Sequence, residues 1–335
     1  MCLKKRLKNL EKSAELYRKR KVFKLHLTIV KFMKVAKNII ELIGKTPIVK
    51  LDRFTKENEA EIYAKLEWYN PGGSVKDRAV KYLIEYAEVS GKLDKSKTIL
   101  EATSGNTGIA LAMIAAVKGY RVKIIMPETV SVERRKIIKA YGAELVLSPG
   151  SKGTGGAIEL KKKLLEEEPE KYVDLNQFKD PVNILAHYQT TGKEIIEQMD
   201  GKFDMVILGI GTAGTGAGIS LCVKEYNPEI KVVGVMPEIG ANIQGLRNTK
   251  EFNPTQLFRK EFFDEIIEIS KEDVEKVYEI AREVARKEGL LVGMSSAAVL
   301  YVAKKKAKEL GKGKRIVVVL PDNGMKYLST EMFES

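Results

Sequence analysis

Cysteine, histidine and tryptophan are scarce in this chain of 335 residues, which contains two, two and one of them. Cys2 and Cys222 are too few for a disulfide framework and fit a reducing, cytoplasmic location. His26 and His187 leave no cluster with metal-ligand spacing, so we expect no metal site. No apolar run approaches the roughly 18 residues that a membrane-spanning helix needs. The sequence therefore argues against disulfide-rich, metal-centred and membrane-spanning proteins.

Repeats and low-complexity segments are also absent, and the basic charge is confined to one end. Residues 1–37 hold thirteen Lys or Arg and two Glu, which is +11 of the net +13. The rest is nearly neutral and shows no basic patch interleaved with aromatic residues, so we expect no nucleic-acid partner. We interpret 1–37 as a basic N-terminal extension. It is too charged for a secretory signal, and it either binds a surface or partner or reflects a later start at Met33.

From residue 60 onward, short β-branched runs alternate with longer amphipathic segments. We expect strands at 62–66, 98–101, 122–126, 145–147, 205–208, 232–235 and 316–320, and helices at 107–119, 131–141, 155–167, 187–199 and 271–288. Alternating strands and helices predict an α/β fold with mainly parallel, twisted sheets flanked by helices. The length suggests two domains. Ligands of such folds bind where the carboxyl ends of the strands lead into helices.

The segment Asn70–Arg78 places Lys76 where a glycine turn enters a helix. The positive end of the helix dipole disfavours an ammonium and lowers the lysine pKa, which leaves more free amine. Such amines form Schiff bases with carbonyl compounds, including pyridoxal phosphate. The alternative is a plain helix start, in which Ser74 and Asp77 form a capping box.

A glycine-rich loop at 209–218 follows the predicted strand 205–208. Its backbone N–H groups can converge on a phosphate. The spacing of Gly209, Gly211 and Gly214 also satisfies a dinucleotide pattern, and Glu238 follows at about the distance of a ribose-binding acid. A nicotinamide-dependent dehydrogenase is therefore an alternative, although it leaves Lys76 unexplained.

A third loop, Thr103–Gly108, offers hydroxyls, an amide and helix-end N–H groups to one small anion such as a carboxylate. The alternative here is an ordinary N-cap by Ser104 or Thr107. Gln177 can donate to the same carboxylate. Ser295 can cap a helix or contact a ring nitrogen.

Together these segments resemble the cysteine synthase family, the fold type II enzymes that use pyridoxal phosphate, from about Asn38 to Thr330. The resemblance rests on Ile43–Pro47, Asn70–Arg78, Thr103–Gly108, Met126–Arg135, Gly211–Thr215, Gly293–Ser296 and Tyr327–Thr330. It implies a larger domain, 38–70 with 181–335, that binds the cofactor phosphate. It also implies a smaller domain, 71–180, that binds the substrate carboxylate, and a fold similar to the tryptophan synthase β subunit.

The resemblance also implies roles for single residues. Lys76 would be the Schiff-base lysine and general base, Asn106 the partner of the cofactor's ring hydroxyl, and Ser295 the hydroxyl at the pyridine nitrogen. A neutral hydroxyl at that nitrogen favours β-elimination over transamination. The phosphate would be held by Gly211, Thr212, Ala213, Gly214 and Thr215, and the substrate carboxylate by Thr103, Ser104, Asn106, Thr107 and Gln177.

The implied reaction replaces the β-substituent of an O-activated serine with sulfide or another sulfur donor, through an aminoacrylate. The chain departs from the commonest family pattern at Ala213, at Ala297 and at Asn323–Lys326, which replaces the usual Ser-Gly-Glu-Arg. Ala213 should still donate its N–H if its φ is negative. The segment Gly245–Asn248, which contains Arg247, resembles the subfamily that uses O-phosphoserine. An arginine suits that leaving group, because a guanidinium can bind a phosphate through two parallel hydrogen bonds. A surface salt bridge is the alternative role for Arg247.

The sequence therefore predicts a cytoplasmic cysteine synthase with a preference for O-phosphoserine over O-acetylserine. Its partners would be small molecules, with a sulfur-carrier protein as an alternative donor, and the family is usually homodimeric. Cystathionine β-synthase or a serine/threonine dehydratase with the same cofactor stays open, as do the dehydrogenase and a non-catalytic protein in which the basic extension is the functional part.

Overall fold

The computed structural model describes residues 35–103, 105–250 and 255–334. The expected basic extension therefore lies almost wholly outside the described residues. Asn38–Ser335 forms one unit of the chain, and this unit contains both sheets. In the described ranges, no helix combines the length and apolar character needed to cross a membrane.

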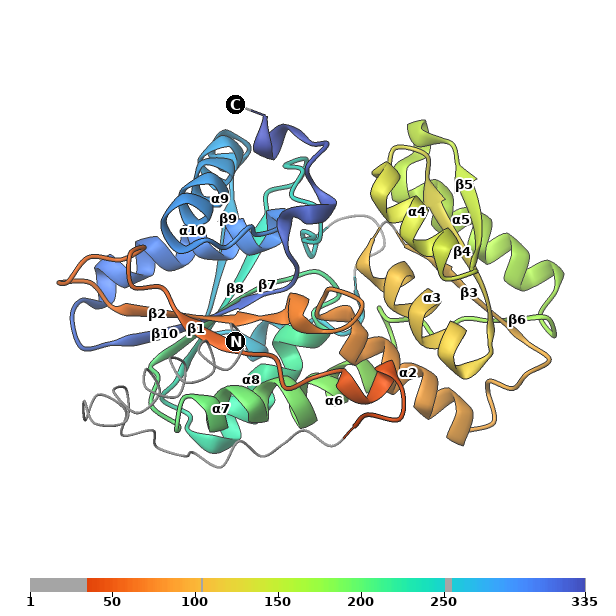
Figure 1. The fold of residues 1–335 in the computed structure, drawn as a ribbon, viewed down its shortest axis with the longest axis horizontal. Coiled ribbons are helices and arrows are strands. Elements are labelled where there is room, and N and C mark those ends of the chain that lie inside the picture. The colour runs from red at the N-terminus through yellow and green to blue at the C-terminus, as the bar shows by residue number, and fades with distance from the viewer. Residues whose placement is uncertain (1–34, 104, 251–254, 335) are drawn as a thin grey trace, which may run out of the picture. The chain divides into compact units, whose positions relative to one another are not determined.

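The larger sheet has six strands, all parallel except the first (Figure 1). Their spatial order is β1 (Ile48–Lys50), β2 (Glu61–Leu66), β10 (Arg315–Leu320), β7 (Met205–Gly209), β8 (Lys231–Pro237) and β9 (Glu265–Ile269). In the central strand β10, Val318 pairs with Ala64 on one side and Ile207 on the other. Residues Ile316–Leu320 are all buried although successive side chains point to opposite faces, so both faces of β10 are covered, as its continuous apolar run predicts.

The smaller sheet has four parallel strands. Their spatial order is β5 (Glu144–Ser148), β4 (Arg121–Pro127), β3 (Thr98–Ala102) and β6 (Tyr172–Val173). Parallel pairing brings the carboxyl ends of these strands to one edge of the sheet, as it does in the larger one.

Nine α-helices connect and cover the sheets: α2 (Lys76–Val89), α3 (Asn106–Lys118), α4 (Val132–Ala140), α5 (Gly153–Glu167), α6 (Val182–His187), α7 (Lys193–Gln198), α8 (Gly214–Tyr226), α9 (Val274–Glu288) and α10 (Met294–Leu310), counted over the described ranges. A π-helical turn, Tyr188–Gly192, joins α6 to α7. Short 3-10 turns occupy Ile39–Leu42, Glu67–Tyr69, Gly150–Lys152, Lys260–Phe262, Lys271–Asp273, Gly324–Lys326 and Glu331–Phe333.

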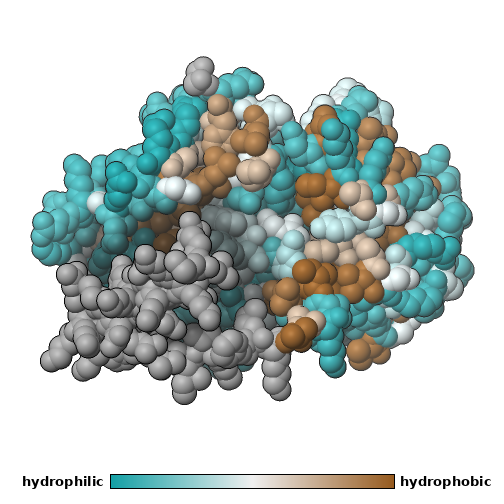
Figure 2. Space-filling model, viewed as in Figure 1, coloured by the Kyte–Doolittle hydropathy of each residue, from teal (hydrophilic) through white to brown (hydrophobic). Residues whose placement is uncertain are grey.

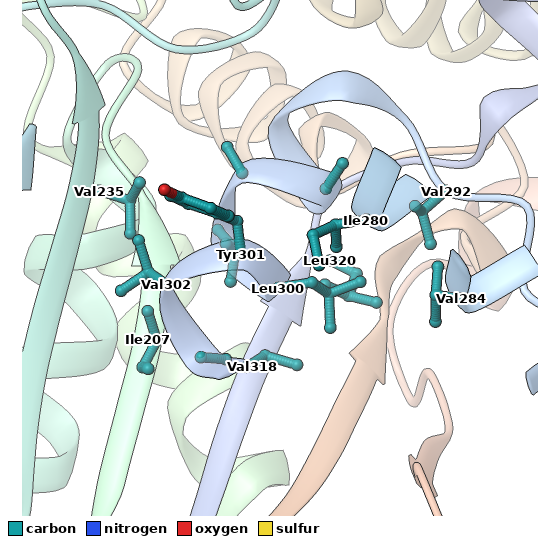
Figure 3. Packing of buried hydrophobic residues seen from close by; sticks show 14 of the residues in the cluster. Ile207, Val235, Ile280, Val284, Val292, Leu300, Tyr301, Val302, Val318 and Leu320 are labelled. Atoms are coloured by element: carbon teal, nitrogen blue, oxygen red, sulfur yellow. The ribbon is translucent and has the colours of Figure 1, made fainter. Parts of the chain in front are cut away.

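Both faces of the larger sheet are covered, and strand β7 shows how. Met205 and Ile207 belong to the core beneath α9 and α10, whereas Val206 and Leu208 belong to the core beneath α7 and α8. This alternation follows from the two-residue period of a strand. In Figure 3, Leu300 and Val302 of α10 pack above Ile207 of β7 and Val318 of β10.

Helix α9 is buried on one side only, through Val277, Tyr278, Ile280, Ala281 and Val284. These residues recur at intervals of three and four, which places them on one helical face. Figure 2 shows mainly hydrophilic residues over the outward side of α9. The pattern in the sequence is therefore that of a surface helix, as expected.

All seven predicted strands are present, but β1, β6 and β9 were not predicted. The first two span three and two residues, and β9 buries only one of its five residues. The helix expected at 187–199 is present, but it begins at Val182, and the π-helical turn divides it into α6 and α7. The helix expected from 271 begins at Val274, after a 3-10 turn. The α/β class is confirmed, whereas the two-domain boundaries stay a prediction.

Candidate active site

A cavity of about 670 Å³ lies among the loops that follow strands of both sheets. Lys76 lines it from the start of α2, and Thr103, Asn106 and Thr107 line it from the loop after β3. Gly211 and Thr212 contribute the loop after β7, and Gln177 and Arg247 complete this group. Lys76 and Arg247 are 171 positions apart in the chain, so the cavity brings together residues that are distant in the sequence. Its place at the carboxyl ends of parallel strands is the one expected for a ligand site.

Lys76 is the first residue of α2. Its pKa is lowered to about 8, because burial disfavours the ammonium and, secondly, because the positive charge of Arg247 lies nearby. The direction agrees with the sequence prediction, and desolvation and the charge of Arg247 are its causes here. The predicted capping box is wrong: Ser74 Oγ accepts from the N–H of Lys76 at 3.2 Å, and Asp77 Oδ2 accepts from the N–H of Gly72 at 2.5 Å.

The glycine-rich loop runs from the end of β7 into α8. Gly211 and Thr212 line the cavity, and Gly214 and Thr215 continue into the first helical turn, whose N–H groups have no acceptor within the helix. A Cβ atom at Gly211 would lie 2.7 Å from the carbonyl oxygen of Gly245. Glycine is therefore required there for the two backbones to approach.

Ala213 has a φ of +67°, in the left-handed region. The condition attached to the predicted N–H donation, a negative φ, is therefore not met. A left-handed alanine costs on the order of 1 kcal/mol relative to its usual conformation. The path of the backbone through this turn, rather than the conformational preference of alanine, therefore sets the direction of the Ala213 N–H group.

The loop after β3 joins the segment that contains Gln177. Thr107 Oγ1 donates to Gln177 Oε1 at 2.8 Å, which leaves the Gln177 amide nitrogen available as a donor. Thr103 Oγ1 accepts from the N–H of Gly105 at 3.4 Å. The helix-capping alternative for Thr107 is wrong, because Gly105 occupies the N-cap position of α3 and the Thr107 hydroxyl is used elsewhere. Ser104 lies outside the described residues.

Asn183 links the two loops and was not identified from the sequence. This fully buried side chain donates from Nδ2 to the carbonyl oxygen of Gln177 at 2.8 Å and to Thr212 Oγ1 at 3.1 Å. Its Oδ1 has no partner among the described residues. No motif singles out Asn183, because its position depends on α6 packing against α8.

Asn106 is held from both sides by charged residues of the segment after β10. Its Nδ2 donates to Asp322 Oδ2 at 2.8 Å, and its Oδ1 accepts from Lys326 Nζ at 2.8 Å. The sequence marked Lys326 only as a departure from the family pattern, and it did not mark Asp322.

The cavity wall is cationic. Among its described residues, Lys76, Arg134 and Arg247 carry positive charge, and none is Asp or Glu. The Arg134 guanidinium lies 4.7 Å from the centre of the Tyr327 ring, and Arg134 also donates to Gln244 Oε1 at 2.6 Å. Arg134 was not identified from the sequence, although it stands in the motif segment 126–135.

Arg247 and Ser295 occupy the wall formed by the larger sheet. The Arg247 guanidinium lies 4.8 Å from the centre of the Phe178 ring, and the side chain lines the cavity. Ser295 belongs to the first turn of α10, and its Oγ would lie 3.2 Å from a Cβ at Gly245, which lines the cavity. The helix-capping alternative for Ser295 is wrong, because Gly293 is the N-cap residue. Glu238 instead accepts the N–H of Lys271 at 3.0 Å, away from the glycine-rich loop.

Comparison with known sequences identifies relatives along nearly the whole chain. A family model described as pyridoxal-phosphate dependent enzyme matches residues 39–322. The cysteine synthase of Staphylococcus aureus strain Mu50 is 46% identical over 307 residues, which cover 88% of this chain and 96% of that protein.

Solved structures share the fold. An O-ureido-L-serine synthase superposes with a TM-score of 0.84 at 35% identity, over 90% of this chain and 96% of that one. A hydrogen sulfide-producing enzyme from Fusobacterium nucleatum gives 0.82 at 40% identity, over 88% and 100%. The cysteine synthase of Entamoeba histolytica gives 0.82 at 40% identity, over 91% and 92%. The chain therefore belongs to the family of pyridoxal-phosphate dependent enzymes, with the fold type II architecture of the cysteine synthases.

Proposed function

We propose that this protein is a cysteine synthase that replaces the phosphate of O-phosphoserine with sulfide or another sulfur donor, and that O-acetylserine is the poorer substrate. The observation that carries the substrate preference is the charge of the cavity. Apart from Lys76, the wall carries two arginines, Arg134 and Arg247, and, among its described residues, no carboxylate, which favours a substrate with an anionic leaving group. O-phosphoserine carries such a group, whereas the acetyl ester is neutral.

The residues around the cavity fit pyridoxal phosphate. Lys76 faces the cavity with a pKa near 8, so that about a quarter of it is free amine at pH 7.5, against about 0.1% for an ordinary lysine. The loop Gly211–Thr215 offers the close backbone and the helix N-terminus that a phosphate requires. When bound, the cofactor supplies an electron sink that acidifies the substrate Cα–H and allows the β-substituent to leave.

Lys76 has two roles in this proposal, as the covalent anchor of the cofactor and as the general base that removes the Cα proton. A base with a pKa near the working pH is effective in both directions of proton transfer. The burial that lowers the Lys76 pKa therefore also suits it to return the proton at the end of the cycle. Ser295 offers a neutral hydroxyl to the ring nitrogen.

The substrate carboxylate has a donor set in the loop after β3. Thr103, Asn106 and Thr107 line one side, with Ser104 between them in the chain, and the Gln177 amide nitrogen lies beside Thr107. The Thr107–Gln177 hydrogen bond orients that amide, because its oxygen is already engaged. This arrangement places a carboxylate beside Lys76 without a further cation.

Arg247 would then bind the leaving phosphate. The Arg247 guanidinium lies over the Phe178 ring at the cavity wall. Its positive charge contributes to the lowered pKa of Lys76. This position supports a role toward a ligand rather than a surface salt bridge. A planar guanidinium can bind two phosphate oxygens at once.

The test compares kcat/KM for O-phosphoserine and O-acetylserine in the parent enzyme and in Arg247→Ala. We expect the variant to lose about 100-fold with O-phosphoserine and less than about threefold with O-acetylserine, because a charge-assisted contact is worth about 1.5–3 kcal/mol. Arg259→Ala, at an exposed arginine that donates to backbone carbonyl oxygens, is the matched control. Equal losses with both substrates would refute the assignment of Arg247.

Related reactions are separated by offering phosphoserine, acetylserine, serine and homocysteine in turn with sulfide. Cysteine as the product supports the proposal, whereas cystathionine or a keto acid points to cystathionine β-synthase or a dehydratase. Borohydride treatment should attach the cofactor irreversibly to Lys76. Unmodified, colourless protein would contradict every role that we propose for the cofactor.

We also infer that the protein is cytoplasmic, in keeping with its two cysteines. We infer a homodimer from the usual assembly of the family. Light scattering of the purified protein would test the assembly. The sulfur donor is proposed to be sulfide, and a carrier-protein thiocarboxylate offered in the same assay would test the alternative.

A further inference from the structure

Lys326 is a buried charge that the proposed function does not use. It lies in the 3-10 turn after β10 and is only 6% exposed. A buried ammonium is costly unless its hydrogens are engaged. The hydrogen-bond partners of the Lys326 ammonium therefore have to account for its burial.

Three segments meet at Lys326. Its Nζ donates to the carbonyl oxygen of Gly73 at 3.0 Å and to Asn106 Oδ1 at 2.8 Å, and it lies 3.9 Å from Asp322 Oδ2. Gly73 belongs to the turn before Lys76, and Asn106 begins α3. Lys326 thus connects the N-terminal ends of α2 and α3 to the segment that follows the central strand β10.

Asp322 is anchored independently of Lys326. Its carbonyl oxygen accepts from the N–H of Gly293 at 3.1 Å and from Ser296 Oγ at 3.0 Å. Its Oδ2 accepts from Tyr327 Oη at 2.9 Å and from Asn106 Nδ2 at 2.8 Å. The carboxylate therefore lies at a fixed place beside the Asn106 amide.

These two neighbours determine which way the Asn106 amide points. An ammonium can only donate and an ionised carboxylate can only accept, so Oδ1 must face Lys326 and Nδ2 must face Asp322. The amide nitrogen carries two hydrogens, and the contact with Asp322 uses one of them. A reversed amide would place an N–H against the ammonium and an oxygen against the carboxylate.

We propose that Lys326 is a positioning residue that locks the Asn106 amide so that its second N–H is always presented to the ring oxygen of the bound cofactor. The inference rests on the proposed function, because it assumes that cofactor at Asn106. It concerns a residue at which this chain departs from the commoner arginine of the resemblance. Lysine and arginine share the property on which the lock depends, since both donate only.

The experiment uses the cofactor-loaded enzyme and the variants Lys326→Met and Lys326→Arg. An N–H donor at an oxygen favours its ionised form, so its loss should raise the pH at which the ring hydroxyl of the bound cofactor ionises. For Lys326→Met we expect the visible absorption of the ionised form at fixed pH to fall, and the cofactor dissociation constant to rise about tenfold, as for loss of about 1.4 kcal/mol. Lys326→Arg should restore both.

Lys161→Met is the matched control, because Lys161 is similarly buried at 8% exposure but contacts Glu101 and Asp174 instead. It should lower thermal stability without altering the absorption or its pH dependence. Should Lys326→Met fail to fold, Lys326→Leu carries the test, since its side chain likewise cannot donate to Asn106 Oδ1.

A folded Lys326→Met or Lys326→Leu enzyme with parental absorption, pH dependence and cofactor affinity would overturn the inference. Failure of the proposed function would look different, because the parent protein itself would then bind no pyridoxal phosphate or make no cysteine. The absorption and its pH dependence respond to the ring oxygen. A loss of fold stability alone would leave them unchanged in the molecules that remain loaded.

Discussion

Lys76 owes its reactivity to neighbours that come from other parts of the chain. Burial in the cavity wall lowers its pKa most, and the charge of Arg247 adds to the effect. The sequence predicts a lowered pKa for this lysine from the helix dipole, whereas burial and Arg247 lower it in the structure. Asp77 accepts from the N–H of Gly72 and does not form the capping box with Ser74 that the alternative interpretation required. Local motifs therefore identify candidate residues, but the contacts of those residues depend on segments that are distant in the sequence.

The dependence of Lys76 on Arg247 can be measured in the protein freed of cofactor. Removing a nearby positive charge favours the ammonium, so Arg247→Ala should raise the pKa of Lys76 from about 8 toward its ordinary value of 10.5. The free-amine fraction at pH 7.5 then falls. The pH dependence of the Lys76 acylation rate, followed by mass spectrometry, should move its midpoint upward. An unchanged or lower midpoint in Arg247→Ala, relative to Arg259→Ala, would contradict this prediction.

At the scale of elements, the glycine-rich helix α8 approaches α6 more closely than side chains would allow. A Cβ atom at Gly218 would overlap the carbonyl oxygen of Ile184 and lie 2.7 Å from the Cβ of His187. The glycines of the loop 209–218 were attributed mainly to phosphate binding from the sequence. The structure shows that Gly218 instead serves helix packing, which holds Asn183 and Thr212 in contact.

Gly218→Ala should therefore lower the free energy of unfolding by about 2–3 kcal/mol, because the extra methyl group overpacks the α6–α8 contact. Gly155→Ala in α5 is the control, since a Cβ there meets nothing within 4 Å. That substitution should be neutral or stabilise by up to about 1 kcal/mol. Urea unfolding of both variants checks the pair, and a Gly218→Ala protein as stable as Gly155→Ala would show that the helices can separate at no cost.

Local periodicity identified the long elements and missed those that depend on pairing. The strands β6 and β9 exist because they find a parallel neighbour in β3 and β8, not because their own residues form a strong pattern. The π-helical turn at Tyr188–Gly192 likewise has no signal in apolar spacing, because one inserted residue shifts the helical face without changing composition.

At the scale of the whole molecule, a largely buried group of four charges connects helix α2 to the larger sheet. Arg78 of α2 donates to Glu67 Oε2 at 2.7 Å and to Glu194 Oε1 at 2.6 Å, and Lys65 of β2 donates to Glu194 Oε2 at 2.7 Å. Glu67 is fully buried. The arginine and the lysine together hold the pKa of Glu194 at about 2, below its usual range. The helix that carries Lys76 is thus tied to the larger sheet.

Arg78→Met should lower the free energy of unfolding by about 3–5 kcal/mol, because it leaves Glu67 buried with a charge that its main partner no longer balances. Glu67 would then bind a proton more readily in the folded state than in the unfolded one, so the deficit should grow as the pH rises above about 4.5. Lys171→Met, which breaks an exposed pair with Glu168, should cost less than about 1 kcal/mol. Denaturant unfolding of both variants at pH 5 and pH 8 measures the difference, and equal losses would contradict it.

The α/β class, the seven main strands, the family and the motif residues of the candidate site all follow from the sequence, because they depend on periodicity and on short runs of residues. The tertiary structure alone decided the contacts. It placed Arg247 near Lys76, Asn183 between two loops and Lys326 against Asn106, across separations of 171, 29 and 220 positions. Such contacts arise when parallel strands bring distant loops to one edge, and no local pattern encodes which side chains then meet.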